Sequence, residues 1–133
     1  MATKKQTTGT LQDRCACEGG SLDRLIQPAV LAALAKEPLH GYALVMRLSE
    51  MPTFAGQSPD TSGVYRVLTW LESRGMVTSS WDTSSSGPAK KTYHITDKGR
   101  LCLRTWVKTL RGYSLAIEEL IEITSQAASR GKG

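Results

Sequence analysis

The sequence is poor in the features that would place a protein in a membrane or in an oxidising compartment. It holds no run of 18 apolar residues, so no transmembrane helix and no membrane partner are expected. Residues 1–10 lack the apolar stretch of a secretory signal, and we therefore expect a cytoplasmic protein. Three cysteines are few and odd in number, which fits a reduced compartment better than a disulfide scaffold.

Side chains that could carry out catalysis are equally sparse. The chain has two histidines, His94 and His40, and His40 could either donate to a phosphate or cap the helix that follows it. We find no nucleophile with a base at a plausible spacing, no glycine-rich phosphate loop and no pair of acids. The sequence therefore predicts no enzyme and no required cofactor.

Positive charge is abundant, and it is concentrated in one segment. The chain has 17 Lys and Arg against 12 Asp and Glu. Such a local excess suits a surface that faces phosphates, but it also suits a solvated helix face, and charge alone leaves both interpretations open. Residues 90–111 contain one acid, Asp97, and seven basic side chains: Lys90, Lys91, Lys98, Arg100, Arg104, Lys108 and Arg111.

Apolar residues at steps of three and four predict three helices in the first part of the chain. They cover residues 23–36, 41–50 and 59–74. Pro28 implies either that the regular part of the first helix begins near it or that an earlier turn is kinked there. The third helix should start with Ser58 as the cap, Pro59 at the first helical position and Asp60 in the first turn. Gly75 should end it in a left-handed conformation.

The second part of the chain predicts a hairpin and one long helix. Residues 76–82 and 91–95 are strand-like, and the loop of residues 83–90 joins them. Thr96 should cap a final helix that runs to about Ser129 and is broken or bent near Gly112. This helix carries a seam of alternating three- and four-residue steps, for which a second copy of the chain is the simplest partner. The seam consists of Leu103, Trp106, Leu110, Tyr113, Ile117 and Leu120.

The predicted fold is mainly α with a small β-hairpin, in the order of a winged helix-turn-helix. Residues 21–96 would form this domain, between a flexible arm of residues 1–20 and a dimerisation helix of residues 97–130. The helix after Ser58 would enter the major groove of double-stranded DNA, with its N-terminus suited to a phosphate. Its expected base readers are Thr61, Ser62, Tyr65 and Arg66, and Ser58 at its start is also expected to contact DNA.

The hairpin would then be the wing. Gly87 and Pro88 would turn it, Lys90 and Lys91 would reach phosphates, and Tyr93 and Ile95 would point inward. An ordinary charged hairpin, or a winged helix that docks a protein instead of DNA, remains open as an alternative. DNA binding should fall steeply with salt, whereas protein docking should not.

Several stretches of the sequence resemble the PadR family of bacterial transcriptional regulators. They are Leu39-His40-Gly41-Tyr42, Gly63-Val64-Tyr65-Arg66-Val67-Leu68, Leu71-Glu72-Ser73-Arg74-Gly75-Met76-Val77, Trp81, Gly87-Pro88-Ala89-Lys90-Lys91-Thr92-Tyr93 and Ile95-Thr96-Asp97-Lys98-Gly99. The resemblance implies a homodimer on an inverted repeat, a repressor, and His40, Tyr42, Tyr65 and the wing lysines near DNA. It also implies a small-molecule effector at the dimer interface. The wing is most similar to a subgroup associated with polyhydroxyalkanoate-responsive repressors.

A few residues lie outside these expectations. Cys15 and Cys17 supply two thiolates, and a tetrahedral zinc site needs four ligands, which two arms of a dimer could provide. A metal or redox sensor and a pair of reduced thiols therefore both remain open. Cys102 should pack as a small apolar residue. Trp70 and Trp81 should pack near the base of the wing, with no ligand role.

Overall fold

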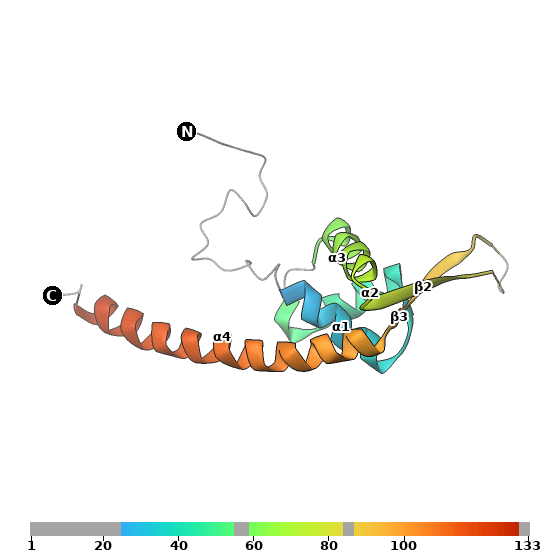
Figure 1. The fold of residues 1–133 in the computed structure, drawn as a ribbon. Coiled ribbons are helices and arrows are strands. Elements are labelled where there is room, and N and C mark those ends of the chain that lie inside the picture. Colours follow the sequence, from blue (N-terminus) through green and yellow to red (C-terminus); the bar gives the residue numbers. More distant parts are fainter. Residues whose placement is uncertain (1–24, 55–58, 84–86, 131–133) are drawn as a thin grey trace, which may run out of the picture.

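The computed structural model describes residues 25–54, 59–83 and 87–130 of the chain. Three short helices and a hairpin form a small domain, and the last helix runs along it and far beyond it (Figure 1). The predicted order and class, mainly α with a small β-hairpin, are confirmed. The elements are α1 (Ile26–Lys36), β1 (Leu39–His40), α2 (Gly41–Ser49), the 3-10 turn η4 (Pro52–Phe54), α3 (Thr61–Ser73), β2 (Val77–Asp82), β3 (Lys90–Ile95) and α4 (Asp97–Arg130).

The core lies where α1, α2 and α3 meet the base of the hairpin. Each helix contributes apolar residues three or four positions apart, so one side of each is buried. Tyr93, which was expected to point inward from the wing, is buried with them. The fully buried side chains are Val30, Leu31, Leu34, Leu44, Leu48, Val64, Leu68, Leu71 and Val77.

The starts of α1 and α3 settle two questions that the sequence posed. Pro28 lies in the first turn of α1, where its missing N–H is not needed by the helix. For α3, the expected cap was wrong. Asp60 is the N-cap, and its Oδ2 accepts a hydrogen bond from the Gly63 N–H at 3.1 Å. Ser58 lies outside the described residues.

The junction between α3, β2 and α4 is built around two glycines. Gly75 has a φ of 77° and ends α3, with the Met76 N–H donating back to the Leu71 carbonyl at 3.0 Å. Thr96 caps α4 as predicted: its hydroxyl accepts from the Gly99 N–H and donates to the Gly75 carbonyl at 2.7 Å. A side chain at Gly99 would overlap the Met76 carbonyl, so α4 can start here only with glycine.

The sheet has three antiparallel strands in the order β1-β3-β2. The two residues of β1 add to the free edge of the hairpin, with Leu39 opposite Tyr93. This third strand was not predicted, because two residues give no alternating pattern. It ties the start of α2 to the wing.

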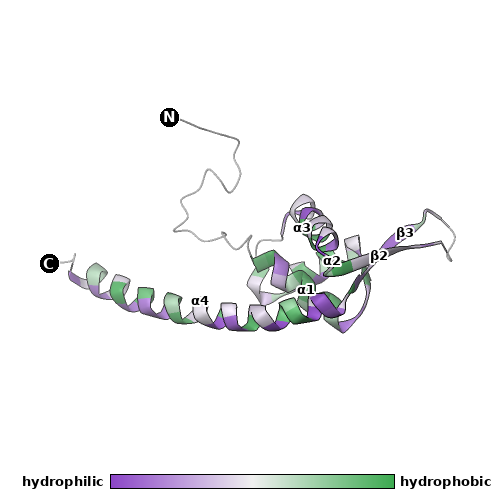
Figure 2. Ribbon diagram, in the orientation of Figure 1, coloured by the Kyte–Doolittle hydropathy of each residue, from purple (hydrophilic) through white to green (hydrophobic). Residues whose placement is uncertain are grey.

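Helix α4 has 34 residues and is continuous across Gly112, so of the two expectations for that position, a break or a bend, the break is wrong. A helix of this length is about 51 Å long. Its hydrophobic and hydrophilic residues alternate along the whole length, including the part that has left the domain (Figure 2). Within the described ranges, no helix is both long and apolar enough to span a membrane.

Candidate nucleic-acid interface

The side of α3 that faces away from the core is polar and open. Thr61, Ser62, Tyr65 and Arg66, the four predicted readers, are all exposed, whereas their neighbours Val64, Leu68 and Leu71 are buried. Ser62 and Arg66 are one turn apart and lie on the same line of the helix. Thr69 continues this line and is also exposed. Thr69 was not among the predicted readers, although its spacing of three from Arg66 was the available signal.

Tyr65 is held against the start of α2. Its ring occupies the space next to Gly41, where any Cβ would overlap the ring and its hydroxyl. The side chain remains 39% exposed, so one part of the ring packs and the other faces solvent. The glycine in the stretch His40-Gly41-Tyr42 thus has a structural reason: it admits Tyr65. The Tyr42 side chain itself is 69% exposed.

His40 immediately precedes α2 and makes no side-chain capping bond, so its predicted capping role is not seen. Instead its Nε2 lies 3.8 Å from Oδ2 of Asp82 at the far end of β2. Its other predicted role, as a donor to a phosphate, stays a prediction. The contact means that the start of α2 and the wing are joined across the sheet.

The wing has two faces, set by the alternation of side chains along its strands. In the register, Trp81 pairs with Lys91, Ser79 with Tyr93 and Val77 with Ile95, and we call these six residues the inner face. The outer face carries Lys90 opposite Asp82, and His94 with its Nε2 3.4 Å from the Ser80 hydroxyl. The two wing lysines therefore point to opposite sides.

The inner face is fastened to α3 through Glu72. One carboxylate oxygen accepts a 2.6 Å hydrogen bond from the Ser79 hydroxyl, and the other lies 3.9 Å from Nζ of Lys91. Burial, followed by the negative charge of Glu72 and the nearby Tyr65, raises the pKa of Tyr93. Glu72 thus fixes how the wing stands relative to α3.

The two tryptophans were expected at the base of the wing, and Trp81 does not lie there. Trp70 is on α3, with the Arg74 guanidinium 5.0 Å from its ring centre. Trp81 is near the outer end of β2 and is 65% exposed. Nζ of Lys91 lies 6.0 Å from the centre of its ring.

Helix α4 divides into two parts. In the first, Cys102, Leu103 and Trp106 pack against the core, and the Trp106 Nε1–H donates to Oε1 of Gln27 on α1 at 3.0 Å. From Leu110 to Arg130 every residue is exposed. Leu103 and Trp106, the first two members of the predicted seam, thus bury part of their surface against their own chain. Their contribution to a dimer stays a prediction.

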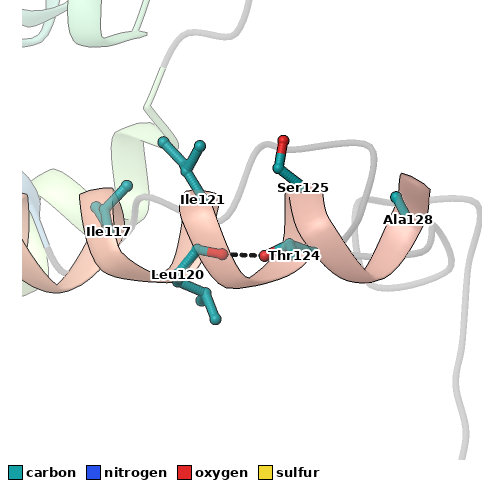
Figure 3. A pocket seen from close by; sticks show the side chains of 6 residues that line it. All are labelled: Ile117, Leu120, Ile121, Thr124, Ser125 and Ala128. Atoms are coloured by element: carbon teal, nitrogen blue, oxygen red, sulfur yellow. Dashed lines mark hydrogen bonds between the residues drawn. The ribbon is translucent and has the colours of Figure 1, made fainter. Parts of the chain in front are cut away.

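The exposed part of α4 carries an apolar surface toward its end. Its lining residues come from three successive turns, and the Thr124 hydroxyl donates to the Leu120 carbonyl between them (Figure 3). The predicted seam residues Ile117 and Leu120 belong to it, and Tyr113 and Leu110 precede it along the helix. The surface is lined by Ile117, Leu120, Ile121, Thr124, Ser125 and Ala128.

The basic segment is split between two surfaces. Lys90 and Lys91 are on the wing, whereas Arg100, Arg104, Lys108 and Arg111 are exposed along α4. Residues 1–24, including Cys15 and Cys17, lie outside the described part of the chain. Within that part, no three His, Cys, Asp or Glu side chains gather as metal ligands.

An exposed polar helix beside a basic hairpin defines a winged helix-turn-helix. The model of the transcriptional regulator PadR-like family matches residues 30–105, more than half of the sequence, and the chain belongs to that family. It is a transcriptional regulator. A comparison with curated proteins finds no match.

Solved structures of similar proteins agree with this assignment. A candidate transcriptional regulator from Thermoplasma acidophilum is 32% identical, with a TM-score of 0.67 over 76% of this chain and 94% of that one. A PadR family transcriptional regulator from Eggerthella lenta is 30% identical, with a TM-score of 0.65 over 76% and 86%. A PadR-like transcriptional regulator from Bacillus cereus is 26% identical, with a TM-score of 0.61 over 75% and 94%.

Proposed function

We propose that this regulator binds an inverted repeat in double-stranded DNA as a homodimer, with α3 in the major groove and the wing along the flanking backbone. The carrying observation is the open polar side of α3, from Ser62 through Arg66 to Thr69, fixed beside the wing by Glu72. Hydroxyl side chains can meet base edges, and Arg66 can pair in bidentate fashion with guanine. The exposed Lys90 supplies attraction for phosphates.

A second copy of the chain is the proposed partner of α4. The segment from Leu110 onward has left its own domain, yet it exposes Tyr113, Ile117, Leu120 and Ile121 on one side. Covering such side chains contributes about 1.5–3 kcal/mol each when burial is complete. A symmetric pair of helices would cover them and would present two copies of α3 to one duplex.

Repression and release by a small molecule remain predictions, as does the likeness of the wing to the polyhydroxyalkanoate-responsive subgroup. A ligand could act only through different affinities for two arrangements of the dimer. The apolar surface around Ile117 and Leu120 is the place we propose for it, between the two copies. A promoter–reporter fusion carrying the operator, with and without the regulator, reads out repression directly.

The test of DNA reading is enrichment of random duplex DNA on the purified protein at near-physiological salt. We expect an inverted repeat whose half-sites are about 34 Å apart, one helical turn. Binding to this duplex should weaken steeply as salt rises. Recovery of no motif, together with salt-independent capture of another protein, would favour a protein-docking winged helix and would reject the proposal.

A further inference from the structure

The wing exposes a tryptophan that neither the fold nor the proposed use of α3 requires. Trp81 lies on the inner face, the same face that meets α3, two residues beyond Ser79 along β2. Two residues of a strand span about 6.7 Å, so Trp81 lies just past the Ser79–Glu72 hydrogen bond and directly opposite Lys91, which forms the ion pair with Glu72. An indole that is 65% exposed gains nothing from the core.

The lysine opposite this indole is already engaged. Nζ of Lys91 is 3.9 Å from a carboxylate oxygen of Glu72, 6.0 Å from the centre of the Trp81 ring and 5.6 Å from that of Tyr93. These contacts place one ammonium between two rings and a carboxylate. Its charge is offset locally by Glu72, whereas Lys90, on the outer face, is exposed.

We propose that Trp81 is the contact of the inner wing face with the sugar-phosphate backbone of DNA, and that Lys91 is a positioning residue that holds the indole. This inference rests on the proposed function, because it needs α3 to enter the groove. The flat ring would pack on deoxyribose next to the half-site, and its Nε1–H is a donor suited to a phosphate oxygen. Lys90, with the positive field around it, draws the backbone toward the same end of the wing.

The position of Trp81 beside α3, together with the positive charge of Lys90, makes DNA the partner that fits the inner face of the wing. Ser79 on the inner face is bonded to Glu72 of α3, and Trp81 follows on the same face, so a duplex bound along α3 would lie beside this face of the wing. The exposed positive charge of Lys90 at the same end of the hairpin favours a polyanion over an apolar partner. Lys91→Met would keep the Trp81 side chain but remove the ammonium group that we propose holds it.

The experiment compares Trp81→Thr, Trp81→Phe, Lys91→Met and Lys90→Met on the duplex recovered by enrichment. Threonine keeps the strand propensity of the position while it removes the ring. We expect Trp81→Thr to weaken binding about fivefold or more, with an unchanged dependence on salt, and Phe to retain part of the affinity. Lys90→Met should lower the slope of log K against log salt by about 0.9 per protomer, whereas Lys91→Met should weaken binding without changing the slope.

Indole fluorescence supplies a second readout that a purely structural role would not move. DNA should shield one tryptophan of the parent from acrylamide, and the shielding should vanish in Trp81→Phe. The shielding should persist in Trp70→Phe, the matched control, because that variant keeps Trp81. The Trp70 ring already contacts the Arg74 guanidinium, 5.0 Å from its centre. Lys91→Met should reduce the shielding, since the ring is then free to turn.

Two outcomes overturn the inference. One is a parent that binds the duplex while Trp81→Thr binds equally well. The other is an indole already shielded before DNA is added, which would show that another protein surface covers it. A parent that binds no duplex at all refutes the proposed function instead, so the two failures are distinguishable.

Discussion

The outer part of α4 offers the sharpest test of the dimer, through the single change Ile117→Ala. The substitution removes three side-chain carbons from a residue that is 57% exposed in the lone chain. At about 0.8 kcal/mol per carbon, burial of that fraction contributes about 1.4 kcal/mol per protomer. A symmetric interface counts it twice, so the dimer should lose about 2.7 kcal/mol, roughly a hundredfold in its dissociation constant.

The matched control is Leu115→Ala. Leu115 is 68% exposed and loses the same three carbons, but it stands two residues away. At about 100° per residue it therefore points about 200° around the helix from Ile117, away from the seam. Both variants should keep the helix, since alanine is the stronger helix former at either position.

The assay is sedimentation equilibrium over a range of protein concentrations, with circular dichroism to check the helix content. Ile117→Ala should dissociate at about a hundred times the concentration at which the parent does, and Leu115→Ala should follow the parent. Binding to the operator should weaken with dimerisation, although Ile117 touches no DNA. An Ile117→Ala protein that stays dimeric at all concentrations, or a Leu115→Ala protein that dissociates equally, would refute the reasoning.

Four further changes test the fold. Asp60→Ala removes the cap of α3 and should lower the free energy of unfolding by about 1 kcal/mol in a denaturant titration, whereas an unchanged midpoint would reject the cap. Gly99→Ala pushes a methyl group into the Met76 carbonyl and should lower the free energy of unfolding by about 1–3 kcal/mol, which a lower thermal midpoint would show. The added methyl group of Gly112→Ala meets open space, so this change should raise the free energy of unfolding by up to about 1 kcal/mol. Equal shifts of the thermal midpoint in the Gly99 and Gly112 variants would contradict the close contact at Gly99. Burial raises the pKa of Tyr93 above its ordinary 10.0, so the folded state holds the phenolic proton longer and stability falls as pH rises above that value. The fall should be smaller in Tyr93→Phe, as measured by denaturant midpoints on both sides of pH 10.

The helices and the hairpin were predictable because local patterns specify them. Gly75 and Thr96 mark the end of α3 and the start of α4 through bonds that span only a few residues, and the structure contains both. The cap of α3 was missed for a local reason as well. Ser58 and Asp60 are both good caps, and Pro59 between them favoured the first. The choice depended on which side chain reaches an N–H, and Asp60 reaches that of Gly63.

The roles of the wing side chains were less predictable, because they depend on contacts distant in sequence. Two adjacent lysines look equivalent in the chain, yet the pleat sends Lys91 to Glu72 and Lys90 to the outer face. Trp81 was expected to pack, since tryptophan usually does, but the wing extends beyond the core at that residue. The reason for Gly41 emerged only when Tyr65, which is 24 positions further along the sequence, was seen to fill the space beside it.

Because α4 is continuous, a change of angle between two paired α4 helices would move the winged-helix domains. Trp106 is bonded to Gln27, and Leu103 packs on the core, so the first turns of α4 move with the winged-helix domain. From Leu103 to Ile117 the helix rises about 21 Å. A rotation of about 10° at the seam would therefore carry each domain about 4 Å, slightly more than the 3.4 Å between base pairs along one strand. Two copies of α3 that match successive major grooves in one arrangement cannot match them in the other. A flexible joint at Gly112 would absorb such a rotation, and an unbroken helix transmits it.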